Sequence, residues 1–328
     1  MTVPDDTHFT AARAVIAGHL EPTPLIRLRL SGIDRPLWAK LETVQPTGSF
    51  KVRGALAACS AYAAEGARIV TASAGNHGLG IAYAATRLGA RATVVVPETA
   101  SSVKVARLRT FDIDLRQIGR DYDEAEQAAL EIASNEGRFV SPYNDPHVIA
   151  GQATVAAELL EQRDRPARHE TITVVVPVGG GGLAAGMAHV LTVQPGWRTV
   201  GVEAAESRAV SAAIEAGHVV RVEVGATIAD GLAGNIEPDS VTPGLLADAH
   251  MPVCAAPESA IRSAVAQLAA EAGLVVEGSG AVGVAALREG ILTDDAVTAD
   301  GPVVVILTGR NIATPLLREL LAERESSS

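Results

Sequence analysis

Residues 171–183 read TITVVVPVGGGGL, an apolar run that leads directly into four consecutive glycines. The valines and isoleucine favour a buried β-strand, and the alanine-rich stretch at 183–193 favours a helix. Consecutive glycines let the backbone turn sharply and direct several N–H groups to one point, where the start of the helix adds partial positive charge. The segment predicts a strand, a phosphate-binding turn and a helix, with a packing turn as the alternative.

The same order of strand and helix recurs along the chain. Further β-branched runs bounded by polar residues or glycine predict strands at 68–71, 92–96, 199–202 and 302–307. Amphipathic, alanine-rich stretches predict helices at 7–19, 51–65, 78–88, 121–136, 148–160, 183–193, 257–271 and 314–323. Strands that alternate with helices predict an α/β fold with an open parallel sheet.

Composition narrows the class of protein. The length of 328 residues predicts about two domains or one large α/β body, and 48% hydrophobic residues exclude a largely disordered chain. The net charge of −11 opposes a nucleic-acid or anionic-membrane partner. Because the start, MTVPDDTHFT, lacks a basic region and an apolar core, and no long uncharged apolar stretch follows, we expect a cytoplasmic protein without a membrane span.

The glycine segment also fits a second kind of cofactor. Gly179-x-Gly181-x-x-Ala184 matches the dinucleotide-binding fingerprint, and Glu203 stands where an acid that binds the ribose is expected. Taken alone, this segment therefore supports a nicotinamide-dependent oxidoreductase nearly as well as another phosphate-binding enzyme.

Lys51 lies in the segment PTGSFKVRG at 46–54, directly after a turn and in the first turn of a predicted helix. The positive end of a helix is an unfavourable place for an ammonium ion. Lys51 is therefore a candidate amine nucleophile, although the segment alone also fits an ordinary exposed lysine.

The segment TASAGNHG at 71–78 also connects a predicted strand to a predicted helix. Its backbone N–H groups and the side chains of Ser73 and Asn76 can surround a carboxylate, and Asn76 can donate to a phenolate oxygen. A phosphate site, an amine nucleophile and a carboxylate site suit a protein that handles an amino acid on an aldehyde-phosphate cofactor.

Together, SFKVRG at 49–54, SAGNHG at 73–78 and the glycines at 179–182 resemble the motifs of the fold type II pyridoxal-phosphate enzymes, specifically the serine/threonine dehydratase (ammonia-lyase) and serine racemase family. The resemblance covers nearly the whole chain and includes TPL at 23–25, KLE at 40–42 and LTGRN at 307–311. The oxidoreductase alternative gives no role to Lys51 or to the 73–77 segment.

The resemblance implies a role for individual residues. Lys51 would be the catalytic residue and would bind pyridoxal 5′-phosphate covalently. Phe50 would pack near the cofactor ring, Asn76 would hold its 3′-oxygen, and Thr308 would face its pyridine nitrogen. The phosphate would be bound by Gly179, Gly180, Gly181, Gly182 and the amide of Leu183. The substrate carboxylate would be bound by Ser73, Ala74, Gly75, Asn76 and His77.

The resemblance also implies the architecture. We expect two open, twisted, mostly parallel sheets flanked by helices, similar to the tryptophan synthase β fold. Residues 1–67 and 146–328 would form a large cofactor-binding domain, and residues 68–145 a small mobile domain. The family suggests a homodimer. Because the sequence ends soon after the LTGRN segment, we expect no feedback control through a C-terminal regulatory domain.

The implied activity is β-elimination from a β-hydroxy amino acid such as threonine or serine, giving a 2-keto acid and ammonia. Ala74 stands where the racemases have a second serine opposite the lysine, and it has no proton to give, so dehydration outranks racemisation. A racemase or another β-eliminating or β-replacing enzyme stays the alternative. 3-Hydroxyaspartate, phenylserine and a hydroxyectoine-derived amino acid are further candidate substrates.

Two departures from the family pattern concern single residues. Arg310 replaces a glycine near the cofactor, which fits either an anionic or bulkier substrate or a salt-bridged surface arginine. Glu203 matches a carboxylate of a Mg or Ca site often found in the family, but Ala209 stands where a second acid is expected, which weakens that site.

Overall fold

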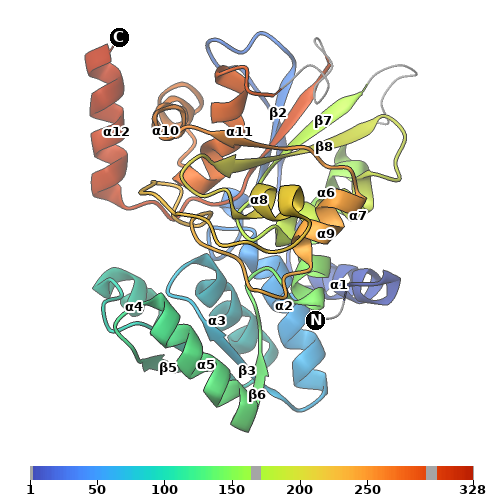
Figure 1. Ribbon diagram of the computed structural model, residues 1–328, viewed down its shortest axis with the longest axis vertical. Helices are drawn as coiled ribbons and strands as arrows, with labels where there is room; N and C mark the ends of the chain where they lie inside the picture. Colours follow the sequence, from blue (N-terminus) through green and yellow to red (C-terminus); the bar gives the residue numbers. More distant parts are fainter. Residues whose placement is uncertain (1–2, 164–170, 293–300, 328) are drawn as a thin grey trace. The chain divides into compact units, whose positions relative to one another are not determined.

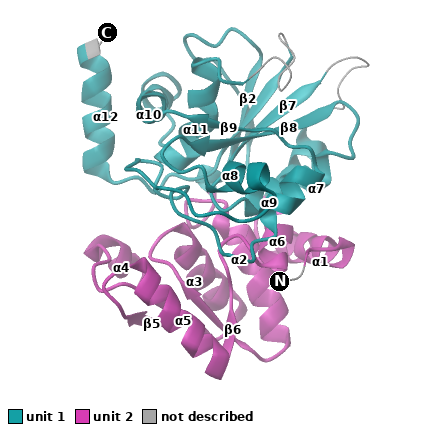
Figure 2. Ribbon diagram, viewed as in Figure 1, with its two compact units in different colours: residues 1, 22–44, 155–328 teal, residues 2–21, 45–154 magenta. Residues whose placement is uncertain are grey.

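The computed structural model describes residues 3–163, 171–292 and 301–327, and its strands form two separate sheets (Figure 1). The chain divides into two compact units (Figure 2). Unit 1 contains residues 22–44 and 155–328 together with residue 1, and unit 2 contains residues 2–21 and 45–154. Each unit has its own sheet and its own hydrophobic core.

Unit 1 contains a six-stranded sheet in which only the β1–β2 pair is antiparallel among the described strands. In sheet order, its strands are β1 (Leu25–Leu28), β2 (Leu37–Leu41), β10 (Val303–Leu307), β7 (Ile172–Pro177), β8 (Trp197–Ala204) and β9 (Val253–Ala256). Every residue of β7 and β10 is buried, as expected for central parallel strands covered on both faces.

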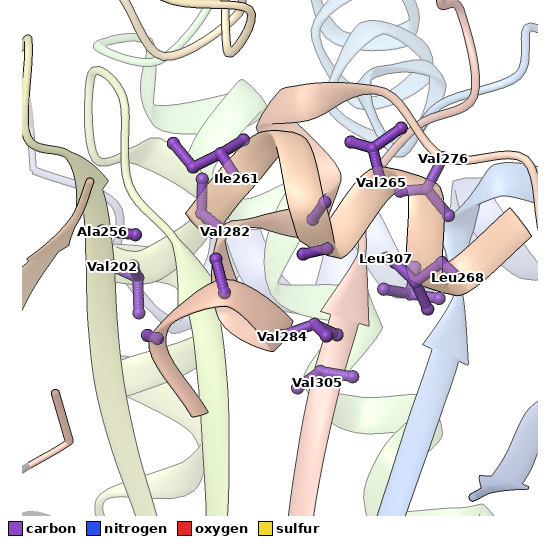
Figure 3. Close-up of a cluster of buried hydrophobic side chains, with 14 of the residues drawn as sticks. Val202, Ala256, Ile261, Val265, Leu268, Val276, Val282, Val284, Val305 and Leu307 are labelled. Atoms are coloured by element: carbon purple, nitrogen blue, oxygen red, sulfur yellow. The ribbon is translucent and has the colours of Figure 1, made fainter. Parts of the chain in front are cut away.

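Helices surround this sheet. They are α7 (Gly182–Leu191), α8 (Ala209–Ala216), α9 (Thr242–Asp248), α10 (Glu258–Ala272), α11 (Gly278–Arg288) and α12 (Thr314–Ser327), with a short 3₁₀ turn, η1 (Glu42–Val44). Helix α11 packs on β7, β8, β9 and β10, α10 packs on α11, and α12 packs on α10. The side chains of Val202, Ile261, Val265, Val282 and Val305 belong to the core between these helices and the strands (Figure 3).

Unit 2 contains a four-stranded, all-parallel sheet. In sheet order, its strands are β5 (Asp114–Gln117), β4 (Ala92–Val96), β3 (Arg68–Ala72) and β6 (Gly137–Phe139). Its helices are α1 (Asp6–His19), α2 (Lys51–Ala64), α3 (Asn76–Leu88), α4 (Ser102–Leu108) and α5 (Tyr122–Glu136). Helix α5 packs on β3, β4 and β6, whereas α2 and α3 pack on each other and on β3. Helix α6 (Pro146–Gln162) begins in unit 2 and ends in unit 1.

The helices α2 and α3 approach closely because a glycine lies at their contact. A Cβ atom at Gly80 of α3 would lie 3.1 Å from the backbone oxygen of Lys51, the first residue of α2. A larger residue at position 80 would push the two helices apart. The sequence at this contact therefore fixes the position of the first turn of α2.

The structure confirms the predicted fold class, with two mostly parallel sheets flanked by helices. The helix predicted at 78–88 begins two residues earlier, so Asn76 and His77 lie in its first turn. All four strands of the smaller sheet lie within residues 68–139. That residues 68–145 move as a domain stays a prediction. Among the described residues, the helices are too short or too polar to cross a lipid bilayer.

Candidate active site

Lys51 is the first residue of α2, after a tight turn in which the Gly48 amide donates to the Gln45 carbonyl at 2.8 Å. Gly48 has a φ of +78°, a left-handed conformation that glycine adopts without steric cost. The Lys51 Nζ donates to the Pro142 carbonyl at 2.7 Å and lies 5.2 Å from the centre of the Phe50 ring. The turn and the helix thus hold a half-buried amine beside an aromatic ring and a backbone acceptor.

The segment that supplies the Pro142 carbonyl connects β6 to α6 and is anchored at both ends. At its start, the Val140 carbonyl accepts hydrogen bonds from Thr71 Oγ1 at 3.0 Å and from His77 Nε2 at 3.1 Å. At its end, Asp145 Oδ1 accepts from the amides of the first turn of α6, and Asp145 Oδ2 accepts from the Tyr62 hydroxyl at 2.6 Å. Burial raises the pKa of Asp145, although these hydrogen bonds oppose the shift.

His77 lies next to this segment with its side chain buried. Burial lowers the pKa of His77 to about 3, and the nearby Lys51 charge lowers it further in the same direction. The imidazole is therefore neutral near pH 7. Since Nε2 lies against the Val140 carbonyl, Nε2 carries the proton, and Nδ1 is a buried acceptor with no hydrogen-bond donor in the described part of the chain.

The 73–78 segment forms the turn from β3 into α3, with Gly75 at the N-cap position. The Gly75 amide donates to Ser73 Oγ at 3.2 Å. A Cβ atom at Gly78 would lie 2.0 Å from the Ser73 carbonyl oxygen, so only glycine allows this close turn. The amides in the first turn of a helix have no acceptor inside the helix, and they suit a carboxylate. The predicted carboxylate-binding residues, Ser73 to His77, therefore lie together at one helix start in unit 2.

The four glycines form the turn from β7 into α7, as the sequence predicts. Gly181 is the N-cap residue with a φ of +85°, and a Cβ atom there would lie 2.8 Å from Thr242 Oγ1. The same Thr242 hydroxyl donates to the Gly180 carbonyl at 2.7 Å. A Cβ atom at Gly179 would lie 3.0 Å from the Cα atom of Leu232. The glycine turn has no side chains of its own, and Thr242 and Leu232 pack against it. It lies at the start of a ten-residue helix, where backbone amides can bind a phosphate.

Thr308 directly follows the central strand β10 and is buried. Its neighbour Gly309 lies against Glu277, the N-cap residue of α11: a Cβ atom at Gly309 would lie 2.4 Å from Glu277 Oε1. The Asn311 amide donates to Glu277 Oε2 at 3.0 Å, and the Glu277 amide donates to the Gly309 carbonyl at 3.0 Å. The segment that contains Thr308 is therefore fixed on both sides by one buried glutamate.

The chain has only three lysines, Lys40, Lys51 and Lys104. Lys40 is fully buried, and its Nζ donates to the Thr23 carbonyl at 2.7 Å, Glu158 Oε2 at 2.6 Å and Gln162 Oε1 at 2.8 Å. Lys104 is exposed on α4. Of the three amines, that of Lys51 has the environment that suits a covalent bond to a cofactor aldehyde.

Glu203 and Arg310 do not belong to the turns described above. The buried Glu203 carboxylate accepts hydrogen bonds from the Val210 and Ser211 amides in the first turn of α8, and burial raises its pKa. No group of three or more His, Cys, Asp or Glu side chains suited to a metal ion occurs among the described residues. Arg310 is exposed.

Three contacts of the site could not be found from sequence motifs. Pro142 contributes a backbone carbonyl, which any residue has. Thr242 and Glu277 support the Gly181 turn and the Thr308 segment from positions 61 and 31 residues away in sequence. Their residue types carry no signal of this role, because threonine and glutamate occur at many positions of a chain without supporting a site.

The chain is similar to proteins of known family. The family model of pyridoxal-phosphate dependent enzymes matches residues 16–309. The L-threonine ammonia-lyase of Geobacter sulfurreducens is 37% identical over 281 residues, which cover 84% of this chain and 67% of that protein. The L-threonine ammonia-lyase of Thermotoga maritima is 36% identical over 289 residues, covering 87% of this chain and 69% of that protein.

A solved structure of maize serine racemase superimposes with a TM-score of 0.86, at 27% identity and with 99% of both chains covered. The match of the family model over most of the chain, and relatives at more than one third identity, show the family. The chain belongs to the pyridoxal-phosphate dependent enzymes and has their fold type II architecture.

Proposed function

We propose that this chain is a pyridoxal-phosphate-dependent ammonia-lyase that converts a β-hydroxy amino acid such as L-threonine or L-serine into a 2-keto acid and ammonia. The observation that carries the proposal is the amine of Lys51, which lies at the start of α2 beside Phe50 and the Pro142 carbonyl. Two curated relatives above 35% identity are named L-threonine ammonia-lyase, which supports the reaction class.

The residues present fit the cofactor. Lys51 would bind the cofactor aldehyde. The amides of Gly179 to Leu183 would bind its phosphate, because no side chain of the glycine turn stands between these amides and the phosphate. Phe50 would pack against the ring, Asn76 would donate to its 3′-oxygen, and Thr308 would face the pyridine nitrogen. When bound, pyridoxal 5′-phosphate supplies an electron sink for the electron pair that is left on the substrate α-carbon.

The protein's own groups then move the protons. The Ser73–His77 turn would bind the substrate carboxylate and orient the α-carbon toward Lys51. As a neutral amine, Lys51 would remove the α-proton. The β-hydroxyl leaves with its bonding electrons and takes one proton, so one water is released. A second water is consumed when the remaining enamine hydrolyses to the keto acid and ammonia.

Thr308 favours elimination over transamination. Its hydroxyl is neutral, whereas a carboxylate at this position would keep the pyridine nitrogen protonated and would strengthen the electron sink. Thr308 would therefore favour loss of the β-hydroxyl over transamination.

A racemase is the second candidate, because the superimposed maize protein is a serine racemase. Racemisation needs an acid on the face of the substrate opposite the lysine. Ala74 offers no proton there, and its side chain packs against the hydrophobic core of unit 2. We therefore place elimination ahead of racemisation. A lyase that prefers 3-hydroxyaspartate, a phenylserine or a hydroxyectoine-derived amino acid would share the mechanism.

The experiment that tests the proposal is a keto-acid assay across β-hydroxy amino acids. Purified protein with added cofactor is given L-threonine, L-serine, 3-hydroxyaspartate and phenylserine, and the keto acid and ammonia are measured. We expect both products in equal amounts from at least one substrate, and none from the Lys51→Ala variant. Formation of a D-amino acid without keto acid would favour the racemase instead.

Two further properties belong to this proposal. We propose a cytoplasmic homodimer, as the family resemblance suggests, and light scattering of the purified protein tests the dimer. We do not include a Mg or Ca ion at Glu203, because its carboxylate already caps the start of α8.

A further inference from the structure

Tyr62, which is half-buried, and Asp145, which is buried, form a hydrogen-bonded pair outside the residues that would touch the cofactor. The Tyr62 hydroxyl donates to Asp145 Oδ2 at 2.6 Å. Tyr62 lies in the last turn of α2, the helix that begins at Lys51, and Asp145 ends the segment that contains Pro142. One helix therefore contacts one short segment at two points, through the Lys51 amine and through the Tyr62 hydroxyl.

Asp145 is placed to hold this segment rather than to react. Its Oδ1 accepts from the His147 amide at 2.9 Å and the Val148 amide at 3.0 Å, so it caps α6. Its other oxygen accepts from Tyr62. Burial and the adjacent Asp145 charge raise the pKa of Tyr62, which keeps its hydroxyl protonated as the donor.

The other end of the segment is held by different residues. The Val140 carbonyl accepts from Thr71 Oγ1 and from His77 Nε2, and the Val140 amide donates to the Val70 carbonyl at 2.8 Å. The Pro142 carbonyl therefore lies between two fixed points. The position of the Pro142 carbonyl therefore depends on the contacts at Val140 and at Asp145. The position of the Lys51 amine, which donates to this carbonyl, depends on the same contacts.

We infer that Tyr62 is a positioning residue: through Asp145 it fixes the Pro142 carbonyl, and that carbonyl orients the Lys51 amine for capture of the cofactor aldehyde. The inference rests on the proposed role of Lys51. Tyr62 itself touches neither the cofactor nor the substrate in this proposal. Its ring packs against His147 with the centroids 5.1 Å apart, so a phenylalanine can keep the ring contact while losing the hydrogen bond.

The test compares Tyr62→Phe with Tyr122→Phe. Tyr122 also donates to a carboxylate, Glu126 Oε1 at 2.8 Å, but on the exposed face of α5. Cofactor-free protein is mixed with pyridoxal 5′-phosphate, and the absorbance of the lysine-bound cofactor is followed in time, together with the thermal unfolding midpoint of the cofactor-free protein and with kcat and KM.

We expect Tyr62→Phe to slow cofactor capture by about three- to tenfold, the range set by loss of one hydrogen bond, and to lower kcat with little change in KM. Tyr122→Phe is expected to load at the parental rate. Equal loading rates and equal kcat values for the two variants would overturn the inference. A lowered unfolding midpoint in Tyr62→Phe would then show only that the hydrogen bond contributes to stability.

The test also covers a Tyr62→Phe variant that does not fold and a parent protein that does not bind the cofactor. If Tyr62→Phe does not fold, Thr71→Val removes a donor at the other end of the same segment, and a parental loading rate in that variant would overturn the inference. If the parent forms no lysine-bound cofactor, the proposed function fails and the inference fails with it. A parent that loads and turns over, with Tyr62→Phe equal to the control, contradicts the inference alone.

Discussion

Gly181 combines two constraints that a side chain cannot meet. Its φ of +85° disfavours any residue with a Cβ atom, and such an atom would lie 2.8 Å from Thr242. Gly181→Ala should therefore lower the free energy of unfolding by about 1–3 kcal/mol and weaken cofactor binding at least tenfold, because the N-cap amides would shift. Chemical denaturation and a cofactor titration measure the two effects.

Gly244 provides the matched control for this prediction. It lies in α9 close in sequence to Thr242, and a Cβ atom there has nothing within 4 Å. Gly244→Ala should leave cofactor binding unchanged and raise stability by up to about 1 kcal/mol, because alanine is the better helix former. Equal cofactor affinities in the two variants would show that the 179–182 turn serves packing alone.

The buried His77 makes stability depend on pH. The folded chain keeps His77 neutral down to a pKa of about 3, whereas an unfolded histidine binds a proton near its ordinary value of 6.5. Below pH 6.5 the unfolded state therefore binds more protons, and the free energy of unfolding falls by up to about 1.4 kcal/mol per pH unit. We expect His77→Gln to show a shallower fall between pH 6.5 and pH 5 by urea denaturation. Parallel pH dependences would contradict the neutral, buried His77.

The proposed function makes Ala74 the residue that favours elimination over racemisation. A serine at this position would place a hydroxyl where the parent has a methyl group, so Ala74→Ser should add some racemisation of L-serine while keto-acid release continues. Chiral chromatography of the residual substrate, run beside the keto-acid assay, separates the two reactions. If the unmodified protein racemises faster than it releases keto acid, another group serves as the second acid and the lyase assignment is wrong.

The sequence could predict the residues whose types are unusual in their setting. A lysine at a helix start and four consecutive glycines before a helix are unusual, and the 73–78 segment combines several polar residues and glycines after a strand. The structure places all three where a strand or turn meets a helix. The residues that contact them in the folded chain could not be recognised from their residue types. Pro142 acts through its backbone, 91 positions from Lys51, and only the folded chain brings the two together.

Lys40 shows how a single buried pair ties elements together. It belongs to β2, and its bonds to Glu158 and Gln162 hold the C-terminal part of α6. Lys40→Met would leave the Glu158 carboxylate, which is largely buried, without its cation, so we expect the free energy of unfolding to fall by about 3–5 kcal/mol.

Urea denaturation measures this change, and the exposed Lys104 gives the control. Lys104→Met should change stability by no more than about 0.5 kcal/mol. Adding Glu158→Gln to Lys40→Met should restore part of the loss, because it removes the negative charge that Lys40 no longer balances. A Lys40→Met variant as stable as Lys104→Met would show that the buried pair contributes nothing.

Elements with continuous β-branched runs or long amphipathic repeats were predictable, and short edge elements were not. The strands β3, β4, β7, β8 and β10 were predicted within a few residues. The strands β5 and β6 lie at the edges of their sheet and have only half-buried or exposed residues, so their sequences lack an apolar run. The strand β2, LWAKL, has its apolar pattern interrupted by Lys40, whose buried amine donates to Thr23, Glu158 and Gln162.

At the scale of the whole molecule, the residues that have roles in the proposed function are divided between the two units. Unit 2 contains Lys51 and the 73–78 turn, and unit 1 contains the 179–182 turn and Thr308. Each part lies at the C-terminal end of a parallel strand or at the start of a helix, where backbone amides are available to anions. The order of strands and helices along the chain thus determines where each functional group is placed.

The most direct test of the account is to find which of the three lysines binds the cofactor. Protein incubated with pyridoxal 5′-phosphate is reduced with borohydride, digested, and analysed by mass spectrometry, with Lys104→Arg as a control that should keep the adduct. The account predicts a reduced cofactor adduct on the peptide that contains Lys51, and its loss in Lys51→Ala together with keto-acid formation. An adduct on Lys40 or Lys104 in an active protein, or turnover that persists in Lys51→Ala, would contradict it.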